Sequence, residues 1–254
     1  MLEQLAEFDE QFGDLYLEMG EDELSIDQIK AAIRRITLSG KAVAVLCGTS
    51  LRNMGVQPLM DAVVDYLPSP SEREQPLATM KRKEEEEEDF RKFRIAHDTN
   101  GPLCALAFKV LNDAHLGPLV FVRVYSGEIN LKTELFNAAT GNIETPTKIF
   151  QMHANIPQDI PCISAGNIGV IAGMKNTRTG DTLLGSKDKL NPYELEKINI
   201  PQPVFFCSIE PESSAMQYML DKALEDLQRE DPSFVVSVDP ETTQTLISGM
   251  GELH

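Results

Sequence analysis

The segment CALAFKVLNDAHLGPLVFVRVYSG spans residues 104–127 and contains two runs of strand length with a turn signal between them. Both runs are rich in Val, Leu and Phe, and an Asn-Asp pair at 112–113 separates them. β-Branched and aromatic runs bounded by turn residues are typical of a hairpin. Similar runs follow at 133–139, 147–152 and 167–174. Five or more short strands within roughly a hundred residues predict a small closed β-barrel over 101–200.

The pattern changes after this barrel. Residues 204–210, VFFCSIE, have the composition of a strand, and an amphipathic helix is expected over 216–229. Two further strands are expected at 234–238 and 245–248. A β-α-β-β order opens a split βαβ fold, which needs one more helix and strand. We therefore expect an incomplete α+β domain over 201–254.

The N-terminal residues show the apolar spacing of helices. The first run ends at Gly20, and a second helix is expected between Ser25 and Gly40. Ser25, with Gln28 three residues later, predicts a capping box at its start.

The run KAVAVLC at 41–47 predicts a buried strand of a parallel sheet. A polar loop over 48–55 and a helix that stops before Pro68 follow it. Helix, strand, loop and helix form the closing stretch of an α/β sheet domain. Such a sheet needs several parallel strands, so we expect this sequence to begin and end inside domains.

Residues 69–100 have the composition of a linker. Two prolines stiffen its start, and KRKEEEEED at 81–89 is a charge run with no apolar face. Such a run predicts a solvated, disordered insertion. A specific acidic docking segment is the alternative.

The net charge of −17 is unevenly distributed along the chain. The acidic excess lies in 1–68 and 200–254, whereas 101–199 holds nine basic and nine acidic residues. Phosphate contacts depend on Lys and Arg, so this balance argues against an autonomous nucleic-acid binder, and only the barrel is suited to lie on RNA. No run of eighteen apolar residues occurs, so no membrane span is expected.

No complete catalytic or metal site is recognisable in the sequence. The four cysteines lie far apart and form no C-x-x-C pair, so we expect buried free thiols rather than a zinc site. The four histidines accompany no Gly-x-Ser-x-Gly elbow. Residues 180–187, GDTLLGSK, approach a phosphate-binding loop, but Lys and Ser are transposed and the two leucines favour a strand.

Several strings in the same order along the chain resemble the elongation factor G family of translational GTPases. They are VLCGTSLRNMGVQPLMDAVVDYLPSP at 45–70, RVYSG at 123–127, NTRTGDTL at 176–183, EDPSF at 230–234 and SGMGELH at 248–254. The resemblance implies a multidomain fold that combines α/β, all-β and α+β parts. Residues 1–68 would be the C-terminal remnant of a P-loop GTPase domain, and 69–100 a charged linker. Residues 101–200 would be the translation-factor β-barrel, and 201–254 a partial ferredoxin-like domain.

The strings FKVLNDAHLGPLVFVRVYSG and PQPVFFCSIEP resemble the mitochondrial, ribosome-recycling branch of that family. The implied function is that of a fragment of a ribosome-binding GTPase that splits subunits together with ribosome recycling factor. Implied partners are the small-subunit rRNA and protein, with no membrane and no DNA, and the implied location is the mitochondrial matrix. A translocation-promoting elongation factor G, a GTPase-dead ribosome-binding module and a cytoplasmic location remain alternatives.

The resemblance also implies GTP and Mg as cofactors of the intact family protein. This sequence lacks the phosphate loop, the switch segments and the Asn-Lys-x-Asp motif. We therefore expect no cofactor and no GTP hydrolysis by this chain alone, and whether it counts as an enzyme stays open.

One loop matches a nucleotide-contacting element of the family. Cys47 to Leu51 resembles the guanine loop, in which backbone amides hold the base, so Thr49, Ser50 and Leu51 are the implied site residues. The alternative is a simple strand-to-helix turn.

Four other residues carry structural expectations. Arg123 and Arg178 either support barrel turns or touch ribosomal RNA. Gly249 and Gly251 are expected to serve a turn with positive φ. Incomplete domains leave apolar faces uncovered, so we expect only the barrel to fold cooperatively in isolation.

Overall fold

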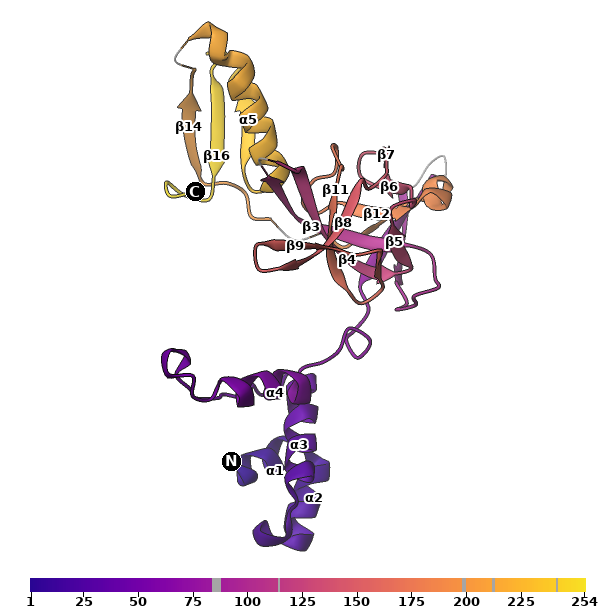
Figure 1. Cartoon of the computed structure of the whole chain (residues 1–254), viewed down its shortest axis with the longest axis vertical. Coiled ribbons are helices and arrows are strands. Elements are labelled where there is room, and N and C mark those ends of the chain that lie inside the picture. The colour runs from indigo at the N-terminus through magenta and orange to yellow at the C-terminus, as the bar shows by residue number, and fades with distance from the viewer. Residues whose placement is uncertain (84–87, 114, 198–199, 212, 241) are drawn as a thin grey trace. The chain divides into compact units, whose positions relative to one another are not determined.

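The computed structural model describes residues 1–83, 88–113, 115–197, 200–211, 213–240 and 242–254, with side chains at all of these except 81–83 and 88–90. The chain forms two compact units, 1–73 and 74–254. Figure 1 shows the first unit as helices and the second as mostly strands. No helix in the described ranges is long and apolar enough to cross a membrane.

The first unit is built from four α-helices. Phe12 and Ala32 are fully buried in its core, which Leu5 and Ile36 complete. The helices are α1 (Leu2–Phe8), α2 (Glu10–Met19), α3 (Ile26–Ser39) and α4 (Val56–Tyr66), with short 3₁₀ turns η1 (Glu21–Glu23) and η2 (Ser50–Arg52).

The predicted cap of α3 is confirmed. The Ser25 side chain accepts from the Gln28 amide, and the Gln28 side chain accepts from the Ser25 amide. Gly40 ends the helix in the left-handed conformation. The first helical run is interrupted at Asp9, whose backbone is extended and whose carboxylate pairs with Arg35 at 2.6 Å.

The expected buried strand at 41–47 is wrong. No strand is assigned there, and Val43 and Val45 are 83% and 86% exposed. A strand requires a hydrogen-bonded neighbour, and the first unit as described contains no strand that could pair with this segment. The segment is therefore unpaired.

The disorder expected for the charge run at 81–89 is wrong at 81–83 and 88–89, because these residues lie in strands. Strands β1 (Leu77–Lys83) and β2 (Glu88–Arg94) pair antiparallel, and β1 also pairs with β13 (Tyr193–Leu195). Apolar residues on either side of the charge run anchor it, because Ala78 and Ile95 are buried. Residues 84–87 of the acidic run lie outside the described residues.

The barrel follows the predicted strand pattern. Its main sheet is antiparallel, with the order β7-β6-β12-β3-β4-β11-β8-β9, and a β5–β10 ladder accompanies it. Val120, Val122 and Val124 alternate into the core with no exposed surface, as a half-buried strand requires. The strands are β3 (Cys104–Asp113), β4 (Gly117–Ser126), β5 (Glu128–Asn130), β6 (Leu135–Asn137), β7 (Ile143–Glu144), β8 (Lys148–His153), β9 (Ile156–Asp159), β10 (Cys162–Ser164), β11 (Ile168–Ala172) and β12 (Thr182–Gly185), after which η3 (Ser186–Leu190) leads to β13.

The C-terminal part has the predicted β-α-β-β order. Strands β14 (Phe205–Ile209), β15 (Val235–Val238) and β16 (Thr245–Gly249) pair in the order β14-β16-β15, and α5 (Gln217–Glu230), preceded by the 3₁₀ turn η4 (Ser214–Met216), lies along the sheet (Figure 1). Strand β14 is at an edge, and its Phe206 is 62% exposed.

The expectation of four buried thiols is confirmed for Cys104 and wrong for the others. All four cysteines are free, but Cys47 and Cys207 are exposed and Cys162 is half-buried. Cys47 is the last residue of the unpaired segment and Cys207 lies on edge strand β14, so neighbouring elements leave both uncovered.

Candidate functional site

The loop before α4 is closed by two backbone hydrogen bonds. The Thr49 N–H donates to the Met54 carbonyl at 2.9 Å, and the Met54 N–H donates to the Thr49 carbonyl at 3.0 Å. Turn η2 lies between them, and Asn53 ends it in the left-handed conformation. The loop is therefore a compact, hydrogen-bonded unit.

This geometry distinguishes the backbone amides of Thr49, Ser50 and Leu51, the three residues that the resemblance implies. The Thr49 amide is consumed by the loop closure. The first paired amide of the 3₁₀ turn is that of Arg52, which bonds to the Thr49 carbonyl at 3.2 Å. The amides of Ser50 and Leu51 precede it, so the turn supplies them with no acceptor. Leu51 is 97% exposed, which leaves its backbone open to a ligand.

Two glycines allow the loop to close. A Cβ on Gly48 would lie 2.8 Å from the Met54 carbonyl oxygen. A Cβ on Gly55 would lie 2.9 Å from the Cys47 carbonyl oxygen, and Gly55 has a φ of +77°. Both positions therefore exclude a side chain.

A hollow of about 280 Å³ lies against this loop. Its lining consists of backbone, hydroxyl and apolar groups, and the residues are Leu46, Cys47, Gly48, Thr49, Ser50, Met54, Gly55, Val56 and Leu59. No Lys or Arg is part of this lining, so it offers no cation for a phosphate.

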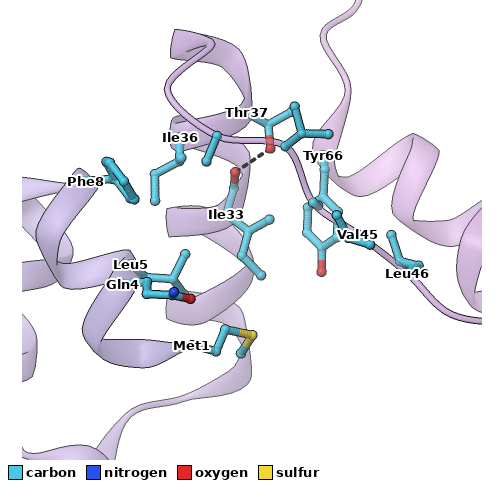
Figure 2. A pocket seen from close by; sticks show the side chains of 13 residues that line it. Met1, Gln4, Leu5, Phe8, Ile33, Ile36, Thr37, Val45, Leu46 and Tyr66 are labelled. Atoms are coloured by element: carbon cyan, nitrogen blue, oxygen red, sulfur yellow. Dashed lines mark hydrogen bonds between the residues drawn. The ribbon is translucent and has the colours of Figure 1, made fainter.

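A second hollow, of about 570 Å³, is larger and more apolar (Figure 2). Figure 2 shows Ile33, Val45 and Tyr66 among its lining residues. Its Thr37 hydroxyl already donates to the Ile33 carbonyl at 2.8 Å. The side chains drawn provide no nucleophile paired with a base, so this hollow has no recognisable chemistry.

The two arginines of the barrel differ in their surroundings. The guanidinium of Arg123 lies over the Tyr125 ring at 5.2 Å, and its buried Nε has no hydrogen-bond partner among the described residues. Arg178 is exposed, and its backbone amide donates to Asp181 at 2.8 Å. The Arg123 contact favours a packing role, whereas the Arg178 side chain is accessible.

Within the segment 180–187, residues Thr182–Gly185 form β12, so the strand expected for the two leucines is confirmed. Leu183 and Leu184 of β12 have no exposed surface. Within the part of the chain that the structure describes, no group of three His, Cys, Asp or Glu side chains could hold a metal ion.

The turn expected at Gly251 is present, because its carbonyl accepts from the His254 amide at 3.1 Å, but Gly249 lies in strand β16 and neither glycine has the expected positive φ. Gly249 instead gives room to His254, whose Nδ1 would lie 2.6 Å from a Cβ there. This Nδ1 accepts from the Met250 amide at 3.0 Å, and the Nε2 lies 2.7 Å from Asp231. The imidazole of His254 thus connects the EDPSF string at 230–234 with the SGMGELH string at 248–254.

The sequence reasoning missed a polar network around Arg229. This arginine is 7% exposed although it lies in the last turn of an amphipathic helix, where charged residues are normally solvated. Its guanidinium bonds to carbonyls of Met174 and Thr177. A charged residue directly before the EDPSF string was the available signal, but its partners lie more than fifty positions earlier.

Comparison with known proteins identifies two parts of the fold. Residues 117–184 match the model of elongation factor Tu domain 2, and residues 200–254 match that of elongation factor G, domain III. The whole chain is 42% identical to "Ribosome-releasing factor 2, mitochondrial" of Rattus norvegicus, of which it covers 33%. The chain belongs to the elongation factor G family. Its barrel and its β-α-β-β part are therefore the second and third domains of that family.

Other relatives agree with this assignment. The chain is 41% identical over its full length to the Danio rerio protein of the same name, and it covers 34% of that protein. It is 44% identical over its full length to "Elongation factor G" of Neorickettsia sennetsu, covering 35% of it. The chain thus spans about a third of the length of the curated relatives it matches. A crystal structure of a Thermus thermophilus protein has the same fold, with a TM-score of 0.74, 23% identity, and coverage of 100% of this chain and 34% of that one.

Proposed function

We propose that this chain is part of a GTP- and Mg-dependent factor that recycles mitochondrial ribosomes, splitting the subunits together with ribosome recycling factor. The observation that carries the proposal is an identity of 41–42%, over the whole of this chain, to relatives named "Ribosome-releasing factor 2, mitochondrial". We also propose a location in the mitochondrial matrix, which the mitochondrial names of these relatives support.

A translocation factor is the second candidate, because the Neorickettsia sennetsu elongation factor G is 44% identical. Overall identity does not separate the two activities. The strings at 108–127 and 201–211 favour recycling, since they resemble that branch of the family.

The activities separate in a reconstituted assay with the intact gene product. Post-termination mitochondrial ribosomes are mixed with the protein, GTP and ribosome recycling factor, and the subunits are resolved by sedimentation. We expect subunit splitting that requires GTP and the recycling factor, and no stimulation of tRNA translocation. Translocation without splitting would refute the recycling assignment and favour the second candidate.

We further propose that the 49–51 loop contacts guanine, with the amides of Ser50 and Leu51 as donors and Thr49 as the residue that closes the loop. The support is geometric, because the Thr49 amide is used internally while the other two precede the first paired amide. Guanine presents the O6 acceptor where adenine presents an amino donor, so two amide donors discriminate between the bases.

Amide chemical shifts of the full chain test this assignment. Millimolar GMP should move the Ser50 and Leu51 signals, and AMP at the same concentration should not. Equal shifts with both nucleotides, or shifts confined to other residues, would contradict it. Binding should be weak because the hollow has no cation for the phosphate. Micromolar affinity would therefore contradict the picture of an isolated base-contacting loop.

A further inference from the structure

One peptide group of the barrel lies between a cation and a carboxylate. The carbonyl of Met174 accepts from Nη2 of Arg229, and the amide of the same peptide, on Lys175, donates to Glu144 at 2.5 Å. The two charges thus polarise one peptide in the same direction. Hydrogen bonds to ionised groups are stronger than neutral ones, and a shared peptide couples the two.

Glu144, at the end of β7, orders the amide side of the loop over 175–177. Its carboxylate also accepts from the Asn176 amide at 2.9 Å and from the Thr177 hydroxyl at 2.8 Å. With the amides held on this side, the carbonyls of Met174 and Thr177 are available to a donor from elsewhere.

Arg229 supplies that donor from α5, which belongs to the third domain. Its Nε donates to the Thr177 carbonyl at 2.7 Å, in addition to the bond to Met174. Burial lowers the pKa of Arg229, and the charge of Glu144 opposes that shift. A buried cation that loses its acceptors is strongly unfavourable, so this side chain ties α5 to the loop.

The end of α5 makes a second set of contacts with the barrel. The Thr179 amide donates to the Arg229 carbonyl at 3.2 Å, and the Thr179 hydroxyl donates to the Glu230 carbonyl at 2.8 Å. The Asn112 amide of β3 donates to the Glu230 carboxylate at 2.7 Å. The last carbonyls of a helix lack partners within it, and here the barrel supplies them.

We propose that Arg229 and Glu144 form a joint that makes the barrel and the third domain move as one body. Both act as positioning residues. Glu144 fixes the loop through the Lys175 amide, and Arg229 fixes the end of α5 through the Met174 carbonyl of the same peptide. A displacement of α5 is then passed to the loop and to β3 instead of being absorbed between the domains. This inference rests on hydrogen-bond geometry and is independent of the proposed function.

The test compares the tumbling of the two domains in the full chain. In the wild type, ¹⁵N relaxation should give amides of α5 and of β4 the same rotational correlation time. The variant Arg229→Met should lower the correlation time of α5 below that of β4. It should also reduce the exchange protection of the Asn112 and Thr179 amides about tenfold or more, since bonds to charged groups contribute strongly. The control Arg178→Met removes a like charge from an exposed side chain next to the loop and should change neither quantity.

A second variant removes the charge from the barrel side. Glu144→Ala leaves α5 untouched, and it should separate the two correlation times in the same direction. Glu134→Ala, at an exposed carboxylate of the same barrel, is its control. The joint is refuted if Glu144→Ala keeps a single correlation time with wild-type protection at Asn112. It is equally refuted if Arg229→Met exposes only the 175–176 amides while α5 and β4 still tumble together.

Discussion

Replacing Gly127 by alanine should destabilise the barrel far more than the same change at Gly141. Gly127 has a φ of +72°, and a Cβ there would lie 2.8 Å from Cα of Leu103 and 3.0 Å from its amide nitrogen. The carbonyl oxygen of Gly101 lies at 3.0 Å as well. These are backbone atoms, so no side-chain rotation relieves the overlap. The Gly127 amide also donates to the Asp98 carbonyl at 2.7 Å, which holds the glycine in place.

The magnitude has two parts. An alanine at such a φ costs about 1–2 kcal/mol. Overlap with fixed neighbours adds about 1–3 kcal/mol. The variant Gly127→Ala should therefore lose about 2–5 kcal/mol of unfolding free energy. Gly141 has a φ of +75° and no atom within 4 Å of an added methyl group, so Gly141→Ala should lose only the first part, about 1–2 kcal/mol.

Urea unfolding of the full-length variants, followed at the amide signals of β4, measures both losses. These signals report on the barrel and not on the helical unit. Equal losses at the two positions, within about 0.5 kcal/mol, would refute the reasoning, because backbone overlap at Gly127 would then contribute nothing.

Three further predictions concern separate parts of the chain. Ser25→Ala should destabilise the helical unit by about 1 kcal/mol because it removes the cap of α3, whereas Ser25→Asp keeps an acceptor; thermal unfolding followed by circular dichroism compares them. Nη2 of Arg34 donates to both carboxylate oxygens of Glu72 and holds the pKa of Glu72 at about 2, below its ordinary 4.5. The stabilisation from this contact is thus present above pH 4.5 and is lost as the pH falls toward 2. The variant Arg34→Met should raise the titration midpoint of the Glu72 carboxyl, as measured by ¹³C NMR. A wild-type midpoint near 4.5 would contradict the contact. Burial raises the pKa of the Cys104 thiol to about 12, so iodoacetamide at about pH 8 should modify exposed Cys47 and Cys207 but leave Cys104 intact, as mass spectrometry can show.

Residues next to each other in the sequence account for most of what could be predicted. The alternation of β4, the capping box at Ser25 and the β-α-β-β order after 204 depend on spacing of two to four residues or on neighbouring turn signals. Such patterns act through local backbone preference, so each element forms in the structure about where the sequence places it.

The candidate guanine loop was found by resemblance, but the resemblance did not show which of its backbone amides are available to a ligand. The string at 47–51 implied Thr49, Ser50 and Leu51 as site residues without distinguishing between them. The structure shows that the Thr49 amide bonds to Met54, because the loop folds back on itself. Which amides are left for a ligand depends on that closure, which no residue type announces.

The remaining features depend on which distant segments meet. Strand β1 pairs with Tyr193–Leu195, far along the chain, as well as with β2, and a charge run gives no sign of that distant partner. The segment at 41–47 has the composition of a strand yet is unpaired, since a strand is completed only by a neighbour. From the sequence alone, Arg229 would be assigned to the solvated face of a helix. In the structure its guanidinium bonds to carbonyls of the loop at 174–177. By itself the sequence determined most of the local elements, the order of these elements along the chain and the resemblance to a family. Only the tertiary structure decided the partners of each edge and each buried charge, because hydrogen bonds between distant residues leave no period in the sequence.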